Sequence, residues 1–172
     1  MSAIIIEEIT KQHERKTFDC GIDKLNLFLQ QQARQKTAKH ISKTYVACLA
    51  PAPTIIVGYY TLTGYSVTTP PTHRDYLKYQ CPLSAVKLAR LAVNSSHQSR
   101  KIGQRLLIDA INRTVLVALQ ISAIGLFVDP MTPNIIPFYQ QYGFLPVDPE
   151  NHSQIEMWLP IKTCVEVTST QI

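Results

Sequence analysis

The chain has 172 residues, of which 45% are hydrophobic and 17% charged, and its formal net charge is +5. This length and composition suit one globular domain with a sizeable core, and they exclude a disordered or fibrous chain. The excess of positive charge is compatible with scattered surface lysines and arginines. It is equally compatible with an anionic partner, such as a phosphorylated cofactor, a nucleic acid or an acidic protein.

The cysteine spacing, the first residues and the lengths of the apolar runs argue against metal-binding, redox, secreted and membrane proteins. No cysteine lies two or three residues from another cysteine or from a histidine, so neither a metal knuckle nor a redox pair is expected. The opening residues MSAIIIEEITKQ place acids directly after three isoleucines, which predicts a strand and not a signal peptide. No apolar run approaches the length of a membrane span, so we expect a cytoplasmic protein without bound metal. The four cysteines, expected to be reduced, are Cys20, Cys48, Cys81 and Cys164.

The N-terminal half alternates between β-rich and helical patterns. Leu25, Phe28, Leu29 and Ala33 recur at helical spacing, with Asp19 or Asp23 available to cap the helix. Turn residues at 51–53 separate two β-rich runs, and a proline-bounded loop follows, with a short helical turn expected around residues 74–78. The expected strand, helix, two strands and loop cover residues 3–9, 18–39, 44–50, 54–67 and 69–83.

The C-terminal half reads as strands alternating with helices. Its long helix carries apolar residues along one side, as a helix that packs on a sheet requires. The expected strand, helix, strand, helix and two closing strands cover residues 85–93, 101–120, 124–128, 134–142, 144–147 and 154–159. With no repeat and no internal linker, the pattern predicts one α/β domain over residues 1–162, followed by a flexible polar tail at 163–172.

The stretch HQSRKIGQRLL, residues 97–107, joins a strand to the long helix and is the first candidate for chemistry. A helix N-terminus presents unpaired backbone N–H groups and binds anions. Ser99 and Gly103 are small enough for a phosphate to approach, while Arg100 and Lys101 add charge. Cations at this end oppose the helix dipole, and a bound polyanion would account for them. A solvated basic first turn is the alternative.

The second candidate is PNIIPFYQQYGF, residues 133–144, which reads as a short helix ended by Gly143. Phe138 and Phe144 are expected in the core. Tyr139 carries a hydroxyl that needs a partner when buried, so it is the aromatic residue to which we assign chemistry.

Taken in order, LARLAV, QSRKIGQRLL, a helix, a strand and PNIIPFYQQYGF resemble the GNAT superfamily of N-acetyltransferases. The loop pattern of that family is Q/R-x-x-G-x-G/A. Gln98 and Gly103 match it, whereas Lys101 replaces its first glycine. The resemblance covers roughly residues 44–160 and implies one mixed sheet of about six to seven strands flanked by about four helices.

A narrower resemblance lies upstream, because FDCGIDKLNLFLQQQARQ at 18–35 is similar to the opening helix of GNAT-type toxins from bacterial toxin–antitoxin pairs. That resemblance implies acetyl transfer from acetyl-CoA to the α-amine of aminoacyl-tRNA, which inhibits translation. It also implies a ribbon-helix-helix antitoxin as partner, and a homodimer.

For this chain, the resemblance places the pantetheine arm of acetyl-CoA along the backbone of residues 91–93, as an added strand. The pyrophosphate would lie on the N–H groups of residues 99–104, and Tyr139 would act as general acid toward the departing thiolate. The residues expected to bind acetyl-CoA are Leu91, Ala92, Val93, Gln98, Ser99, Arg100, Lys101, Ile102, Gly103, Gln104, Asn134 and Phe138.

The residues say less about the group that accepts the acetyl than about the acetyl-CoA site. KLARLAV contains no carboxylate that could serve as a base. A lysine amine with a pKa of about 10.4 needs such a base more than an α-amine at about 7.7–8.0, which agrees with aminoacyl-tRNA. Alternation along the strand puts Lys87 and Arg90 on opposite faces, so at most one of them lines the substrate groove. The cations expected to contact tRNA are Arg34, Lys36, Lys39, Arg74, Lys78 and Arg90.

Two alternatives stay open. The acceptor could be a small amine or a protein N-terminus, with the same chemistry. The chain could also be a CoA-binding or RNA-binding module without catalysis, because a fold does not by itself determine a function.

Overall fold

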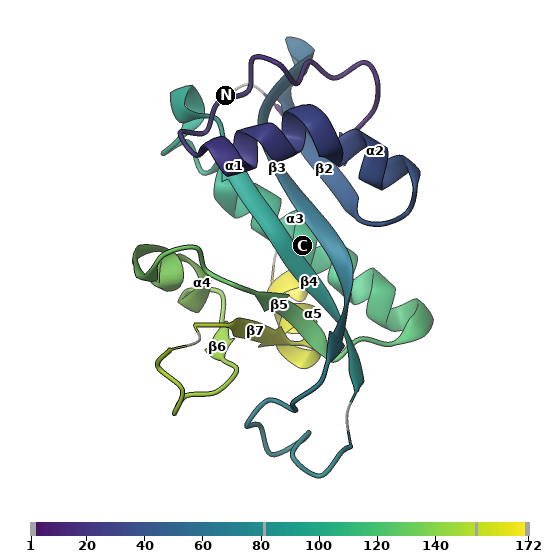
Figure 1. Cartoon of the computed structure of the whole chain (residues 1–172), viewed down its shortest axis with the longest axis vertical. Coiled ribbons are helices and arrows are strands. Elements are labelled where there is room, and N and C mark those ends of the chain that lie inside the picture. The colour runs from purple at the N-terminus through teal and green to yellow at the C-terminus, as the bar shows by residue number, and fades with distance from the viewer. Residues whose placement is uncertain (1–2, 81, 154, 171–172) are drawn as a thin grey trace. The chain divides into compact units, whose positions relative to one another are not determined.

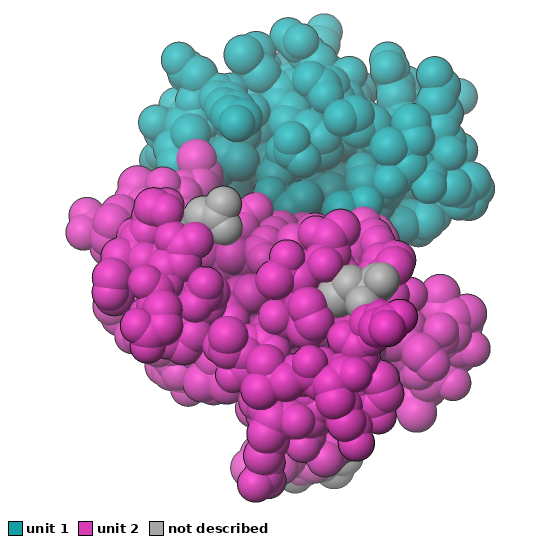
Figure 2. Space-filling model, turned by 60° about the horizontal axis from the view of Figure 1, so that its bottom comes forward, with its two compact units in different colours: residues 1–63, 89–110 teal, residues 64–88, 111–172 magenta. Residues whose placement is uncertain are grey.

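The computed structural model describes residues 3–80, 82–153 and 155–170. The chain is a mixed α/β protein whose seven-stranded sheet has the order β1-β2-β3-β4-β5-β7-β6 (Figure 1). It divides into two compact units, residues 1–63 with 89–110 and residues 64–88 with 111–172 (Figure 2). The long strands β3 (Ala52–Val67) and β4 (Leu83–Val93) and the helix α3 (Ile102–Ile121) each contribute to both units. The predicted α/β class and mixed sheet are confirmed.

The first unit is built on antiparallel strands. β1 (Ile4–Glu8) pairs with β2 (Lys43–Leu49), and β2 pairs with β3. Tyr45 and Tyr60 lie opposite each other, and their rings stack with centroids 5.2 Å apart. Such cross-strand aromatic pairs stabilise a sheet and hold its register.

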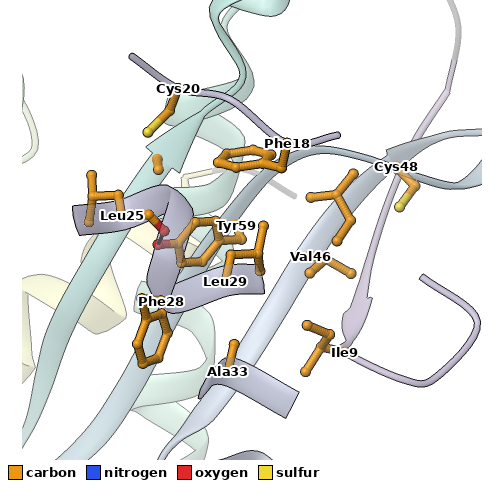
Figure 3. Packing of buried hydrophobic residues seen from close by; sticks show 12 residues of the cluster. Ile9, Phe18, Cys20, Leu25, Phe28, Leu29, Ala33, Val46, Cys48 and Tyr59 are labelled. Carbon is orange, nitrogen blue, oxygen red and sulfur yellow. Dashed lines mark hydrogen bonds between the residues drawn. The ribbon is translucent and has the colours of Figure 1, made fainter. Parts of the chain in front are cut away.

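One continuous helix covers this part of the sheet. It runs through α1 (Asp23–Leu27), a π-helical segment (Phe28–Gln32) and α2 (Ala33–Ala38). Figure 3 shows Leu29 beside Tyr59 of β3, and Leu25 and Phe28 belong to the same buried cluster. The Tyr59 hydroxyl donates a 2.8 Å hydrogen bond to the Leu25 carbonyl, so the phenol is buried without losing its polar partner.

The helix start differs from expectation. Ile22 occupies the N-cap position and makes no side-chain cap, whereas Asp23 is the first helical residue. Asp19 instead accepts hydrogen bonds of 2.8 Å from the Gly21 N–H and from the Asn26 amide. These bonds lower the pKa of Asp19, and the carboxylate therefore orders the turn before the helix without capping it.

The second unit continues the sheet with mixed strand directions. β5 (Gly125–Val128) runs parallel to β4, and β7 (Met157–Pro160) runs antiparallel to both β5 and β6 (Leu145–Pro146). A short 3-10 turn at residues 133–135 leads into α4 (Ile136–Gln140). The buried cluster of this unit contains Val67, Ala85, Phe127 and Trp158.

The predicted loose tail is corrected by the structure. Residues 161–169 form helix α5 (Ile161–Ser169), and residues 171–172 lie outside the described part. Cys164 anchors this helix, because its side chain is fully buried. The same burial raises the pKa of its thiol to about 12. Cys20 and Cys48 are also buried free thiols, and Cys81 lies outside the described residues.

No membrane span was expected from the sequence. Among the described residues, no helix combines the length and the apolar character needed to cross a bilayer.

Candidate functional site: the turn before α3 and the α4 aromatics

The first candidate region is the loop that joins β4 to α3. After Val93, the side chain of Asn94 accepts a hydrogen bond of 3.1 Å from the Ser96 N–H and so caps a short 3-10 turn at residues 95–97. The first helical residue of α3 is Ile102, so the loop residues that precede it are 98–101. The segment for which the sequence predicts anion binding therefore lies between the 3-10 turn and the first residue of α3.

Two residues of this loop adopt a left-handed backbone. Ser99 has a φ of 65° and Lys101 a φ of 60°, a region in which a Cβ atom costs about 1–2 kcal/mol. Lys101 stands where the GNAT pattern has its first glycine. A left-handed backbone at this position accounts for a preference for glycine, because glycine takes this conformation without strain.

Gln98 holds the loop in place. Its Nε2 donates to the Val93 carbonyl at 3.2 Å and to the Cys20 carbonyl at 3.5 Å. The backbone N–H of Ser95 donates to the Asp19 carbonyl at 2.8 Å beside it. Gln98, expected to bind acetyl-CoA, thus has a structural role in fastening the turn to the strand end.

A cavity of about 440 Å³ opens beside the loop and is both basic and apolar. Arg100, Lys101 and Arg105 are exposed on it. Three cations beside the free N–H groups of a helix start are suited to an anion such as a pyrophosphate. The lining residues are Ile4, Leu49, His97, Ser99, Arg100, Lys101, Ile102 and Arg105.

The start of α3 sits close to the sheet because Gly58 has no side chain. A Cβ atom there would lie 2.9 Å from Leu106 Cδ1 and 3.1 Å from the Ala92 carbonyl oxygen. The first contact is shorter than real Cβ contacts and the second is tighter than most of them, so the absence of a side chain at Gly58 lets Leu106 of α3 pack closely on β3.

Some of the predicted tRNA-contacting cations gather around Phe28. The Cζ atom of Arg90 lies 3.7 Å from the ring centroid, and Lys36 Nζ lies 5.5 Å from it. Arg34 lies on the same helix, and its Nε is buried without a partner among the described residues. Lys39 is exposed at the helix end. These cation–π contacts place the charged groups of Arg90 and Lys36 near the Phe28 ring, and no acidic partner of either is found within the described part of the chain.

Arg74 and Lys78 belong to the second unit and so form a separate group. Arg74 is largely exposed and lies 3.8 Å from an oxygen of Asp75. Lys78 Nζ lies 5.6 Å from the ring centroid of Tyr79. This segment is a chain of hydrogen-bonded turns and not a helix.

Tyr139, the predicted catalytic residue, lies in α4 among aromatic rings. Only 4% of it is exposed, and its ring meets those of Phe138 and Phe144 edge-on at centroid distances of 5.2 and 5.3 Å. Burial raises the pKa of its hydroxyl to about 12. The phenol therefore stays protonated across the physiological range and can serve as a hydrogen-bond donor. Phe138 is partly buried, and Asn134 is exposed on the preceding turn.

A polar network in the second unit was missed from the sequence. Lys87 Nζ lies 2.9 Å from Asp129 Oδ2 and also contacts Glu156 Oε2. The Tyr65 hydroxyl donates a 2.9 Å hydrogen bond to the same oxygen of Glu156. The signal in the sequence is a lysine within a mostly apolar strand, because a buried lysine requires carboxylate partners.

Comparison with known proteins adds a family and a set of relatives. The model of a family described as acetyltransferase (GNAT) domain matches residues 19–162. A curated protein of Mycobacterium tuberculosis, the tRNA-acetylating toxin, is 29% identical over 136 residues, which are 77% of this chain and 80% of that protein.

Two solved structures of AtaT match almost the whole chain. One shows AtaT complexed with acetyl-methionyl-tRNAfMet, with 28% identity, a TM-score of 0.84, and 96% of this chain and 98% of that chain covered. The other shows a tyrosine-to-phenylalanine mutant of the AtaT toxin bound to the C-terminus of the antitoxin AtaR and acetyl-CoA. It has 27% identity and a TM-score of 0.79, with 97% and 99% of the two chains covered.

Proposed function

Because the chain belongs to the GNAT acetyltransferase family, we propose that it transfers acetyl from acetyl-CoA to the α-amine of aminoacyl-tRNA and so inhibits translation. The observation that carries the proposal is the likeness, over 96% of this chain, to AtaT complexed with acetyl-methionyl-tRNAfMet. The tRNA-acetylating toxin of Mycobacterium tuberculosis supports the same class of substrate.

The loop before α3 supports acetyl-CoA as the acetyl donor. Its pyrophosphate would accept hydrogen bonds from the N–H groups at the start of α3, where no intrahelical partner exists. Arg100 and Arg105 would neutralise its charge, and Lys101 would contribute its backbone N–H. The pantetheine arm would pair with the backbone of residues 91–93, and Asn134 and Phe138 would contribute from the segment after β5.

The chemistry needs little from the protein beyond positioning and hydrogen bonds. The amine nitrogen forms a bond to the acetyl carbonyl carbon, the carbon–sulfur bond breaks, and the sulfur keeps the electron pair. The amine loses one proton to solvent, and the thiolate gains one. Backbone N–H groups at the end of β4 would stabilise the negative charge on the carbonyl oxygen.

Tyr139 assists the leaving group in this scheme. A thiol has a pKa of about 8.5, whereas burial raises the pKa of Tyr139 to about 12. Complete proton transfer from the phenol to the thiolate is therefore uphill. Tyr139 acts by donating a hydrogen bond as charge develops on sulfur.

The cations supply contacts to the tRNA backbone. The guanidinium carbon of Arg90 lies 3.7 Å from the centroid of the Phe28 ring, and the N–H groups of this guanidinium would donate to phosphate oxygens. Such contacts give salt-dependent binding without base specificity. The full set proposed for tRNA is Arg34, Lys36, Lys39, Arg74, Lys78 and Arg90.

The proposed partners follow from the same relatives. AtaT was solved with the C-terminus of its antitoxin AtaR, which supports neutralisation of this chain by an antitoxin, of ribbon-helix-helix type in our proposal. The protein would act in the cytoplasm as a homodimer. Leu116, Leu119 and Ile121 are exposed on α3, and covering them in a dimer would remove apolar surface from water.

Induced expression in a bacterial host tests the proposed function. We expect growth arrest with the wild type and relief with Tyr139→Phe at equal protein levels. A harmless wild type contradicts the toxin activity. An equally toxic Tyr139→Phe variant favours a non-catalytic binding module, and acetylation confined to small amines or protein N-termini favours those acceptors.

A further inference from the structure

The second unit contains a cavity of about 600 Å³ that the proposed function has not used. Three segments far apart in the sequence form its walls. They are the end of β3, the residue that follows β5, and the segment that joins β6 to β7. All of them lie within residues 64–88 and 111–172.

Lys87 pairs with two of the carboxylates that line this cavity. Its side chain is 12% exposed and sits between two carboxylates, with Asp129 Oδ2 at 2.9 Å and Glu156 Oε2 in contact. Its Nζ also lies 4.5 Å from the ring centroid of Tyr65. These partners compensate the burial of the ammonium group and hold both carboxylates in position.

The cavity keeps a negative charge after this pairing. Three carboxylates line it, those of Asp129, Asp148 and Glu156, and Lys87 is the one cation that the described residues pair with any of them there. Three negative charges and one positive charge leave a balance of −2. This contrasts with the formal net charge of +5 for the whole chain.

Glu156 presents an oxygen for a ligand. The bonds from both Tyr65 and Lys87 go to Oε2, and among the described residues no partner is found at Oε1. The side chain of Glu156 is 22% exposed. An ionised carboxylate oxygen accepts a charge-assisted hydrogen bond from a cation.

The cavity lining also contains apolar side chains. Val67, Val147 and Ile155 line the cavity together with these carboxylates. An ammonium group attached to a carbon that also carries a side chain matches both the acidic and the apolar residues of this lining. The aminoacyl end of a charged tRNA has this chemistry.

We propose that this cavity receives the aminoacyl end of the substrate, with the α-ammonium held by Glu156 and Asp129 and the amino-acid side chain against Val147 and Ile155. This inference rests on the proposed function and names the group that the enzyme recognises. Recognition of the ammonium separates aminoacyl-tRNA from uncharged tRNA, and the apolar lining residues select among amino acids by size. Glu156 is a positioning residue in this account, because it holds the ammonium group, which gives up one proton to solvent before the neutral amine attacks.

Steady-state kinetics with methionyl-tRNA as the probe tests the assignment. We expect Glu156→Gln to raise KM for methionyl-tRNA by about tenfold or more, since an ionic hydrogen bond is lost. The affinity for acetyl-CoA, measured by calorimetry, should stay within about twofold. Glu150→Gln is the matched control, because this exposed carboxylate lies in the same segment but outside the cavity lining. Unchanged KM in Glu156→Gln overturns the proposal.

Asp129→Asn keeps the test valid if Glu156→Gln fails to fold. Asp129 is 66% exposed, so its substitution disturbs the buried network less, and it should raise KM in the same direction. A second readout uses methionyl-tRNA whose α-amine is replaced by hydroxyl, added as a competitive inhibitor. The wild type should bind this probe about tenfold more weakly than an amide-linked methionyl-tRNA, and Asp129→Asn should reduce that preference. An undiminished preference overturns the proposal.

The design separates failure of this inference from failure of the proposed function. If the wild type acetylates no charged tRNA but acetylates methionine methyl ester, the proposed tRNA substrate is wrong. A higher KM of Glu156→Gln for that ester would still support the cavity. If methionyl-tRNA is acetylated and neither variant changes its KM or its preference, the cavity assignment is wrong and the proposed function stands.

Discussion

The side chain of Gln98 fastens the loop before α3 to the end of β4, because its Nε2 lies 3.2 Å from the Val93 carbonyl oxygen. Gln98→Leu keeps the volume and removes the donor. We expect a loss of about 1 kcal/mol in the free energy of unfolding. We also expect acetyl-CoA to bind about fivefold more weakly, since the turn is less well held. Chemical denaturation and calorimetry measure the two effects, and unchanged affinity would show that the turn needs no such tie.

Two substitutions of Lys101 separate the effect of backbone strain from the effect of side-chain charge. Lys101→Ala keeps the Cβ atom at a φ of 60° and removes the charge, whereas Lys101→Gly removes both. Relief of left-handed strain is worth about 1–2 kcal/mol, offset in part by the greater freedom of glycine in the unfolded chain. We expect the glycine variant to be more stable than the alanine variant and to keep its affinity for acetyl-CoA.

If both Lys101 variants lose affinity about tenfold, or about 1.4 kcal/mol, the ammonium itself holds phosphate. That result would contradict cradling by the backbone N–H groups. Equal stability of the alanine and glycine variants would in turn contradict the strain assigned to this position.

Gly58 and Gly64 form a matched pair on β3. A Cβ atom at Gly58 would lie 2.9 Å from Leu106 Cδ1, whereas nothing lies within 4 Å of one at Gly64. Gly58→Ala should lower the free energy of unfolding by about 1–3 kcal/mol through overpacking. Gly64→Ala should change it by less than about 0.5 kcal/mol. Thermal unfolding of the two variants compares them, and equal effects would rule out close packing as the reason for Gly58.

Tyr139→Phe should lower kcat about 100-fold or more and leave the fold intact, because the ring keeps its contacts with Phe138 and Phe144. Burial raises the pKa of Tyr139 to about 12, so its hydroxyl remains protonated below that pH. The wild-type rate should therefore show no loss from Tyr139 ionisation up to about pH 10. A descending limb below pH 10 that disappears in Tyr139→Phe would contradict this environment.

The sequence predicted those parts of the fold that follow from local pattern. The long helix was expected at 101–120 and is found at residues 102–121, because its apolar residues recur at helical spacing. The loop before it was identified from residue types. Its left-handed backbone at Ser99 and Lys101 was not, since no local preference of lysine or serine favours that conformation.

The rest depended on contacts between distant segments. Helix α5 has a mixed polar sequence and is held by the buried Cys164, which packs only once the sheet is formed. Lys87, Asp129 and Glu156 come from three segments and meet through the pairing of β5 with β4 and β7. Periodicity within one segment contains no information about such a meeting.

Mass spectrometry of aminoacyl-tRNA after incubation with isotope-labelled acetyl-CoA tests the central claim most directly. The account predicts one labelled acetyl group on the α-amine of the esterified amino acid, with the wild type and not with Tyr139→Phe. Labelled acetyl found only on free amines or protein N-termini, with every charged tRNA unmodified, would contradict it.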